Sequence, residues 1–384
     1  MRVAKTGNEA IAWAMKQIEP DVVAAYPITP ATEVVMIFSQ YVADGLVKTE
    51  YVPAESEHSA MSACIGATAA GARAMTATAA QGLALMWEML YIASGLRLPI
   101  VMAEVNRTLS SPINIHCDHS DTMGARDSGW IQIYSENAQE AYDNTIQAVR
   151  VAEGCRLPAM VTIDGFIISH GMEAIDILDD SDVKDFVGEY KPAYTLLDTK
   201  NPITLGSIDF TDYYFEHKMQ TIDAMNKAMD VIKSVQNEFF QKFGRKYNPV
   251  EGYKLEDAEF VIVALGSTCG TIKVVVDSLR EEGIKVGLLK IMVFRPFPSS
   301  EIRNLLSGKK AIAILDRATG LNADYGPVCL EVRSSLYGIP EPPRVINYIY
   351  GLGGRDTTIE HIERVYSDLM SDKKEDVYYL GVRE

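Results

Sequence analysis

Short runs of apolar residues alternate along the chain with longer segments in which apolar positions recur at helical spacing. This alternation is typical of β-α-β units, in which helices join parallel strands and cover the faces of the sheet. We therefore predict an α/β protein built on parallel sheets. The predicted strands are Val22–Tyr26, Ile100–Val105, Met160–Ile163, Phe260–Leu265, Val286–Met292 and Ala311–Leu315.

The pattern also predicts two domains. Apolar residues recur at helical spacing from Ile222 onward and stop at the helix breaker Gly244, which predicts one long amphipathic helix. The segment 248–257 is polar and reads as a linker. We expect a larger domain at residues 1–247, closed by the long helix, and a smaller α/β domain at residues 258–384.

Residues 171–214 show little periodicity and contain an acidic run from Asp179 to Glu189. A long irregular segment inside a compact domain is often functional or forms an interface. We expect either an arm that lies over the domain surface or a neighbouring subunit, or a solvated acidic loop.

Charge and cysteine usage narrow the class of protein. The chain has 36 basic and 52 acidic residues, a net charge of −16, which makes nucleic-acid binding unfavourable. Its five cysteines are scattered and include no CxxC pair, so we expect neither a disulfide framework nor an iron–sulfur cluster on this chain, and a reducing cytoplasm. No charge-free stretch is long enough for a membrane span. The first residues do not combine a basic segment with an apolar one, so we expect no secretory signal.

The first candidate site is the turn from Tyr26 to Pro30, at the end of the first predicted strand. Ligands of parallel sheets gather at the carboxyl ends of the strands. Two prolines would present the hydroxyl and amide of Thr29 rigidly, which suits a substrate carboxylate or a ring edge. The structural alternative is a turn in which Thr29 is only a helix N-cap.

The second candidate is Glu57, which follows an extended segment ending at Pro53 and precedes a helix of small residues at Ala60–Ala72. An acid at that place either complements the helix dipole or is a buried carboxyl that bonds a ligand nitrogen. Glu55 competes for both roles.

The third candidate is Arg107, which follows the strand ending at Val105 and could clamp a carboxylate. The polar loop after it carries His116, Asp118, His119 and Asp121. Their spacing matches no familiar set of metal ligands, so we interpret them as a turn network and expect no metal on this chain.

A fourth candidate is a polar turn of Thr76, Thr78, Gln81 and Gly82 before a helix at Leu83–Leu96. Its amides could meet a ligand, but the chain contains no GxGxxG, GxxxxGK[ST], GxSxG or HExxH motif.

These segments together resemble a known family. The resemblance rests on YPITP, PAESEHSAM, NRTLSSPINIHCDHSDTMGARDSGW, ENAQEA, TIDGFIISH, FRPFP and GLGGRD, in that order. Their order and spacing resemble the 2-oxoacid:ferredoxin oxidoreductases, with the best match to the alpha subunit of pyruvate:ferredoxin oxidoreductases. FRPFP reads as a strand-to-helix connection, and GLGGRD as a structural turn or, less expected, a contact with coenzyme A.

The resemblance implies a thiamine-diphosphate enzyme that oxidatively decarboxylates a 2-oxoacid, reduces ferredoxin and transfers the acyl group to coenzyme A. It implies a pyrimidine-binding domain followed by a transketolase C-terminal-like domain. The GDG sequence of the diphosphate side and the cysteine runs of the clusters are missing here. A beta subunit should therefore supply the diphosphate side and Mg²⁺, gamma and delta subunits should carry 4Fe-4S clusters, and ferredoxin should dock on another subunit.

The resemblance also implies roles for residues. Glu57 would bond the pyrimidine nitrogen and drive the cofactor's activation, with Glu55 as the fallback, and Tyr26, Pro27 and Gln81 would line the cofactor. Thr29 and Arg107 would hold the substrate carboxylate. A neutral pocket favours pyruvate, while 2-oxoglutarate, branched-chain 2-oxoacids and a non-catalytic assembly subunit remain alternatives.

Overall fold

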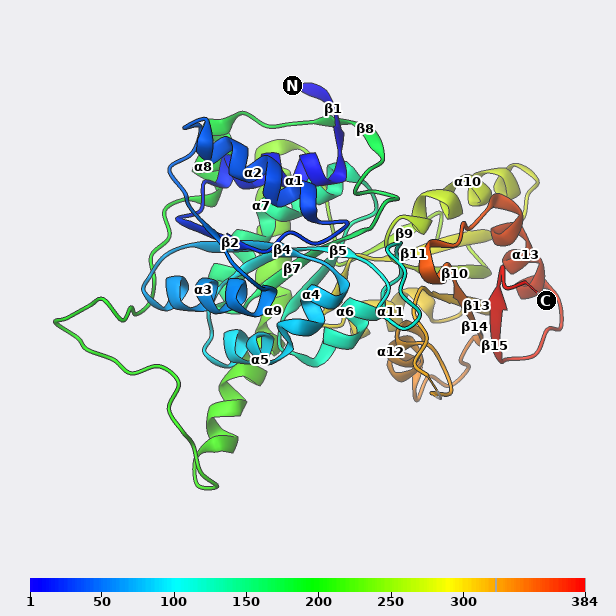
Figure 1. The fold of residues 1–384 in the computed structure, drawn as a ribbon. Coiled ribbons are helices and arrows are strands. Elements are labelled where there is room, and N and C mark those ends of the chain that lie inside the picture. Colours follow the sequence, from blue (N-terminus) through cyan, green and yellow to red (C-terminus); the bar gives the residue numbers. More distant parts are fainter. Residues whose placement is uncertain (322, 384) are drawn as a thin grey trace.

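The computed structural model describes residues 1–321 and 323–383. It consists of two α/β lobes that lie side by side, the larger carrying the N-terminus and the smaller the C-terminus (Figure 1). Each lobe has its own sheet, and helices cover both faces of each sheet. The α/β prediction is confirmed.

The larger lobe is centred on a seven-stranded sheet. Its strands are β2 (Val22–Ala25), β3 (Glu50–Pro53), β4 (Ala74–Thr78), β5 (Val101–Asn106), β6 (Ile131–Tyr134), β7 (Ala159–Asp164) and β12 (Val293–Arg295). The order across the sheet is β12-β6-β7-β5-β4-β2-β3, and every neighbouring pair is parallel except β12 with β6. A parallel sheet is buried on both faces, which explains the near-continuous apolar runs in these strands.

Helices pack on both faces of this sheet and form an apolar core with each face. The helices are α1 (Gly7–Ile18), α2 (Thr32–Ala43), α3 (Glu57–Ala69), α4 (Ala80–Leu85), α5 (Trp87–Gly95), α6 (Ser120–Gly124), α7 (Ala138–Cys155), α8 (Asp180–Val187) and α9 (Tyr214–Phe243), with the 3-10 turn η1 at Ala125–Asp127. Residues of α1, α2 and α7 share one core, and residues of α3 and α5 share the other. Strand β5 contributes side chains to both cores, because Ala103 faces the first and Met102 the second. A small antiparallel pair, β1 (Arg2–Thr6) with β8 (Met172–Asp176), lies beside them.

The smaller lobe has a six-stranded sheet of order β15-β14-β13-β10-β11-β9. Its elements are β9 (Val250–Tyr253), β10 (Phe260–Ala264), α10 (Thr268–Glu281), β11 (Val286–Ile291), α11 (Ser299–Leu306), β13 (Ala311–Asp316), α12 (Pro327–Leu336), β14 (Arg344–Tyr350), η2 (Leu352–Gly354), α13 (Ile359–Met370) and β15 (Val377–Leu380). All pairs are parallel except the edge strand β9 with β11.

The two lobes are joined by shared strands and by buried charges. Strand β12, which follows β11 in the chain, adds to the edge of the larger sheet by pairing with β6. The ammonium group of Lys290, in β11, is buried against Glu140 and lies 2.8 Å from Glu136, at the α7 end of the larger lobe. The carboxylates outweigh the cost of burial and raise the pKa of Lys290, so it stays charged.

The six predicted strands are all present, with ends that differ from the prediction by at most one residue. The long helix also ends as predicted, because Gly244 takes the left-handed conformation that caps it, with φ of 74°. The predicted linker at 248–257 is wrong as an element assignment: it contains β9, which pairs with β11 and leaves its other edge open to solvent.

Two further element predictions are corrected. Thr76 and Thr78 belong to β4 and not to a turn, since β-branched residues suit a strand and Thr76 donates to the carbonyl of Ala24 at 2.7 Å. The predicted helix at Leu83–Leu96 starts earlier and is broken at Met86 into α4 and α5.

The irregular segment is shorter than expected. Its acidic run forms α8, where acids in the first turn complement the helix N-terminus and Asp180 pairs with Lys16 at 2.7 Å. The remaining arm, residues 188–213, first packs on the body through the amide of Leu196 and the carbonyl of Ala69, then projects away from the lobe (Figure 1).

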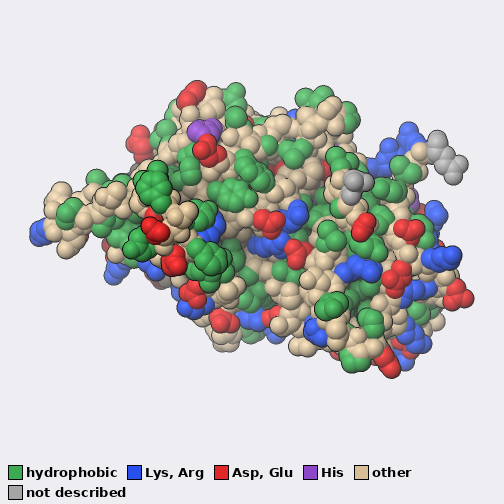
Figure 2. Space-filling view, turned by 90° about the horizontal axis from the view of Figure 1, so that it is seen from below, with side chains coloured by type: hydrophobic (Ala, Val, Ile, Leu, Met, Phe, Trp, Pro, Cys, Tyr) green, Lys and Arg blue, Asp and Glu red, His purple; other side chains and the backbone are tan. Residues whose placement is uncertain are grey.

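The arm and the start of α9 leave large apolar side chains exposed. The most exposed are Leu197, Ile208, Phe210, Tyr213, Tyr214 and Phe215. Figure 2 shows hydrophobic side chains gathered where the arm leaves the body. Separately, among the helices of the described residues, none has the length and apolar character needed to cross a lipid bilayer.

Candidate active site

The candidate residues gather at one edge of the larger sheet. Strands β2, β3, β4 and β5 are mutually parallel, so their carboxyl ends meet at the same edge. Thr29 follows β2, Glu57 follows β3, Gln81 follows β4 and Arg107 follows β5. The topology therefore brings together residues that lie far apart in the sequence.

Glu57 is the first residue of α3, whose N-cap Ser56 accepts a hydrogen bond from the amide of Ser59. Glu57 is buried, with 6% of its surface exposed. No group among the described residues donates a hydrogen bond to its carboxyl. The competing acid Glu55 is exposed and bonds the hydroxyl of Ser59 at 2.5 Å. Burial without a partner separates Glu57 from Glu55.

Gly82 packs closely against Glu57. A Cβ on Gly82 would lie 2.8 Å from Oε1 of Glu57 and 2.3 Å from Oγ1 of Thr78. Oγ1 of Thr78 and Oε1 of Gln81 are buried and have no hydrogen-bond partner within the described part of the chain. A carboxyl, a hydroxyl and an amide oxygen without partners fit a ligand that carries ring nitrogens and an amino group.

Gln81, next to Gly82, contacts the loop after β5. Its amide nitrogen donates to Oγ of Ser110 at 2.9 Å. Gln81 lies inside α4 and not in a turn before the helix, so the predicted turn is wrong at this position too.

Arg107 and Thr29 are neighbours. The guanidinium donates to the carbonyl of Thr29 at 2.9 Å through Nη1, and to the carbonyl of Asn114 at 3.0 Å through Nε. Arg107 is 8% exposed, and burial lowers its pKa, although the charge of Asp121 acts in the opposite direction. The arrangement leaves Nη2 without a partner among the described residues, as a carboxylate anchor requires.

Thr29 does not cap a helix. Helix α2 begins at Thr32 after Ala31 and has no side-chain cap, so the N-cap interpretation of Thr29 is wrong. Thr29, Tyr26 and Pro27 are exposed, and they form the rim of the site where β2 ends.

The polar loop after Arg107 does not form one cluster. His116 stacks on Phe166, Asp118 accepts from the amide of Ser120, and Asp121 contacts the ends of β4 and β5. The glycine turn around η2 packs on this loop, since the amide of Gly354 donates to the carbonyl of Cys117 at 2.7 Å.

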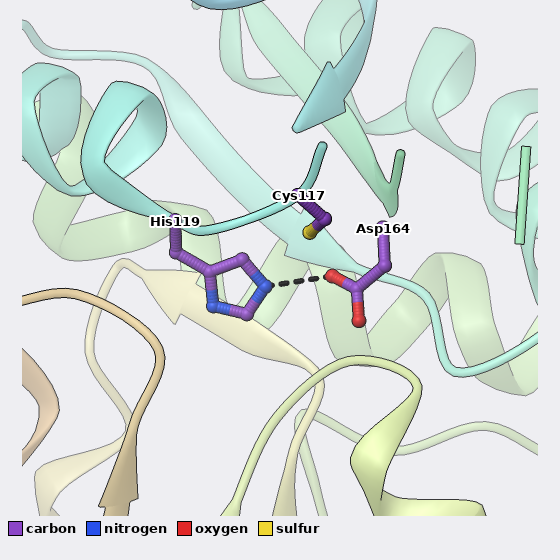
Figure 3. A group of neighbouring side chains, drawn as sticks. All are labelled: Cys117, His119 and Asp164. Atoms are coloured by element: carbon purple, nitrogen blue, oxygen red, sulfur yellow. Dashed lines mark hydrogen bonds and ion pairs between the residues drawn. The ribbon is translucent and has the colours of Figure 1, made fainter. Parts of the chain in front are cut away.

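His119 points in another direction, into the junction between the lobes, where it faces Asp164 beside Cys117 (Figure 3). Nε2 of His119 lies 2.7 Å from one oxygen of Asp164, and Nη1 of Arg317 lies 2.7 Å from the other. Burial alone would raise the pKa of Asp164, but the charges of Arg317 and His119 outweigh it and hold that pKa well below its usual value.

This junction is an ion-pair network, and its residues do not suit a bound metal ion. The guanidinium of Arg317 already neutralises Asp164, and burial raises the pKa of the Cys117 thiol well above its usual value, so the thiol stays protonated and is a poor ligand. The sequence analysis missed Asp164 and Arg317. Both directly follow or end predicted strands, the same signal that pointed to Arg107.

Two protein families match the chain. Residues 13–237 match the family described as "Pyruvate flavodoxin/ferredoxin oxidoreductase, thiamine diP-bdg". Residues 258–362 match "Pyruvate:ferredoxin oxidoreductase core domain II". The first match contains all the residues gathered at the edge of the larger sheet.

Relatives align over nearly the full length. The pyruvate synthase subunit PorA of Thermotoga maritima is 58% identical and covers 100% of this chain and 98% of its own. PorA of Methanocaldococcus jannaschii is 48% identical over 99% and 97% of the two chains. The ketoisovalerate oxidoreductase subunit VorA of Pyrococcus horikoshii is 44% identical over 95% and 92%.

Solved structures share the fold. A 2-oxoglutarate:ferredoxin oxidoreductase from Magnetococcus marinus superposes with a TM-score of 0.74 at 22% identity, covering 96% of this chain. The chain spans only 65% of that longer protein. A split-gene transketolase superposes with a TM-score of 0.54 at 11% identity, over 94% and 93% of the two chains.

Proposed function

The chain belongs to the pyruvate:ferredoxin oxidoreductase family, and from this premise we propose that it is the alpha subunit of a multi-subunit enzyme that acts on pyruvate. The reaction converts pyruvate, coenzyme A and two oxidised ferredoxins to acetyl-CoA, CO₂, two reduced ferredoxins and a proton, and it is reversible. In domain terms, residues 1–247 bind the pyrimidine end of thiamine diphosphate, and residues 258–384 form the transketolase C-terminal-like domain.

The observation that carries the proposal is the unpartnered carboxyl of Glu57. It is buried, lies at the carboxyl edge of the sheet, and packs against Gly82, where a Cβ would lie 2.8 Å from its Oε1. When bound, thiamine diphosphate supplies a ring carbanion that attacks a keto carbon. In this chain Glu57 would hold the pyrimidine nitrogen, Gln81 would bond the ring's polar edge, and Tyr26 and Pro27 would border it.

Thr29 and Arg107 would bind the substrate. A 2-oxoacid carries one carboxylate, which the free Nη2 of Arg107 can anchor while the hydroxyl of Thr29 orients it. Thr29 is uncharged and Arg107 supplies one cation, so we favour a 2-oxoacid with a small uncharged side chain over 2-oxoglutarate, whose second carboxylate would need another cation.

The site should discriminate less strongly between 2-oxoacids whose uncharged side chains differ in size. One methylene changes binding by only about 1–3 kcal/mol, so some activity on 2-oxobutyrate is expected. A relative named ketoisovalerate oxidoreductase is 44% identical, which keeps a branched-chain 2-oxoacid as the second candidate.

The other half of the site would come from partners. The sequence has no GDG motif and no cysteine pair of cluster type, so a beta subunit would bind the diphosphate and Mg²⁺, and gamma and delta subunits would carry the 4Fe-4S clusters. Ferredoxin would dock on those subunits, because the net charge of −16 repels an acidic carrier. A cytoplasmic location is supported by the five cysteines, which are all free and buried.

The test compares Glu57→Ala with the matched control Glu55→Ala, each assembled with its partner subunits. We expect 2-oxoacid- and coenzyme-A-dependent reduction of a viologen dye to fall by about a hundredfold or more in Glu57→Ala, while the complex still assembles. The exposed control should keep wild-type activity. Full turnover by Glu57→Ala would contradict the proposed role and favour a non-catalytic assembly subunit.

A further inference from the structure

Two buried carboxyl groups lie directly behind the candidate active site. Glu104, in β5, is fully buried, and Asp121, in α6, is 3% exposed. The family resemblance and the site residues assigned above give neither a role. Both side chains contact the backbone of the segments that carry the site residues.

Asp121 accepts hydrogen bonds on both of its oxygens. Oδ1 accepts from Nδ2 of Asn106 at 2.9 Å and from the amide of Thr122 at 2.7 Å. Oδ2 accepts from the amide of Arg107 at 2.8 Å and from the amide of Ala80 at 3.3 Å. Burial raises the pKa of Asp121, although the hydrogen bonds from Arg107, Asn106 and Thr122 act in the opposite direction.

Glu104 accepts at the same amide. Its Oε1 accepts from the amide of Ala80 at 3.2 Å, and its Oε2 has no hydrogen-bond partner among the described residues. Burial, with the charge and hydrogen bonding of Asp121 added to it, raises the pKa of Glu104 well above its usual value. Glu104 and Asp121 therefore meet at one backbone amide, that of Ala80.

The amide that both carboxyl groups contact lies in a strained turn. Ala80 joins β4 to α4 and has φ of 41°, a conformation that non-glycine residues rarely adopt without support. Gln81 and Gly82 come next, beside Glu57. Two carboxyl oxygens on one amide hold that turn in place.

We propose that Glu104 and Asp121 form a positioning pair: the two carboxyl groups together hold the amides of Ala80 and Arg107. In this way they fix the β4–α4 turn, with Gln81 and Gly82, against the strand end that carries Arg107. The catalytic meaning of this pair rests on the proposed function, while its effect on the backbone does not.

The proposal separates two substitutions of Glu104. Glu104→Gln keeps an oxygen that can accept from the amide of Ala80, so the turn should be preserved. Glu104→Leu, of similar volume, removes this acceptor. Asp121→Asn turns an amide donor toward backbone N–H groups and should act like Glu104→Leu.

The experiment measures amide hydrogen exchange and steady-state kinetics on the full chain assembled with its partners. We expect Glu104→Leu and Asp121→Asn to exchange faster in peptides covering residues 79–83 and 106–108, and to raise the pyruvate KM about tenfold with a smaller change in kcat. Glu104→Gln should match wild type in both readouts. Leu369→Ala, in the core of the smaller lobe, is the control for general loss of stability and should not change exchange at 79–83.

The proposal is overturned if Glu104→Leu leaves exchange at residues 79–83 and the pyruvate KM unchanged. It is also overturned if Glu104→Gln is as impaired as Glu104→Leu, because an oxygen that accepts from the amide of Ala80 would then not be enough to hold the turn. If the wild-type complex turns over no 2-oxoacid, the proposed function fails, and the exchange data alone decide the positioning role.

Discussion

At the scale of single residues, Gly82 determines how much space surrounds the carboxyl of Glu57. Any side chain at this position would meet Oε1 of Glu57 and Oγ1 of Thr78 at less than contact distance. Both groups are buried in a close-packed interior, so they cannot move aside freely. The requirement for glycine here is one of space.

Substitution of Gly82 by alanine should therefore disturb the site without removing any functional group. We expect Gly82→Ala to weaken the response to thiamine diphosphate and to lower activity of the assembled enzyme by about tenfold or more, since displacement of a catalytic group by an ångström can cost about a hundredfold. The measurement is activity against thiamine diphosphate concentration.

Gly66 provides the control within α3, the helix that carries Glu57. A Cβ there meets nothing within 4 Å, so Gly66→Ala should keep full activity and stabilise the helix by up to about 1 kcal/mol. Equal activity of Gly82→Ala and Gly66→Ala would show that the close packing of Gly82 against Glu57 is not needed for activity.

The sequence was sufficient to select some of these residues and not others. Glu57 and Arg107 could be predicted because polar residues that follow strands of a parallel sheet meet at one edge. Glu104 could not be predicted, because it lies inside a predicted apolar strand, and a single acid there says nothing about which face it occupies or what lies opposite. The choice of Glu57 over Glu55 also needed the family resemblance, and only the structure shows that one is buried and the other exposed.

At the scale of elements, six strands could be predicted because burial on both faces requires unbroken apolar runs. Strand β4 lies inside the larger sheet but was not predicted, because its threonines interrupt the apolar run. Two edge strands were also not predictable: β9 and β12 are defined by antiparallel pairing with residues distant in the sequence. The break between α4 and α5 at Met86 contains neither glycine nor proline, so no local breaker marks it.

Besides the ion pairs of Lys290, a second ion-pair network joins the two lobes. Asp164 ends β7, Arg317 follows β13, and Ser267 precedes α10 and donates its amide to Asp164 at 3.0 Å. Each of these side chains is at the carboxyl end of a strand or the start of a helix. The network therefore ties the carboxyl edges of the two sheets together.

Loss of the cation from this network should destabilise the chain in a pH-dependent way. We expect Arg317→Gln to lower the free energy of unfolding at neutral pH by about 3–5 kcal/mol, because it leaves a buried charge unpaired. In the wild type the low pKa of Asp164 contributes stability that is present above its usual value near 3.8 and is lost as the pH falls below that value. The gap between wild type and variant should therefore shrink on acidification, as measured by urea unfolding across this range.

Lys227→Gln supplies the comparison, because Lys227 pairs with Asp223 on the exposed face of α9. Its effect should not exceed about 0.5 kcal/mol at any pH. If Arg317→Gln behaves like this surface variant, the network does not hold the lobes together.

At the scale of the whole molecule, the proposed function gives this chain one half of a cofactor site, and the structure shows large apolar side chains exposed on its surface. The buried acid is in place, but the motif expected of the diphosphate side is missing from the sequence. The arm and the start of α9 expose apolar side chains that a monomer rarely leaves in water. Both features are expected of a subunit whose surface is completed by other chains.

The central claim is that Glu57 of this chain holds a cofactor whose other end is bound by a partner. The most direct test is the structure of the assembled complex with thiamine diphosphate bound. We predict that the carboxyl of Glu57 lies within hydrogen-bonding distance of a pyrimidine ring nitrogen, at about 2.5–3.2 Å, while the diphosphate contacts another subunit. A ring nitrogen paired with a different acid, Glu55 included, or a cofactor held entirely by one chain would contradict the account.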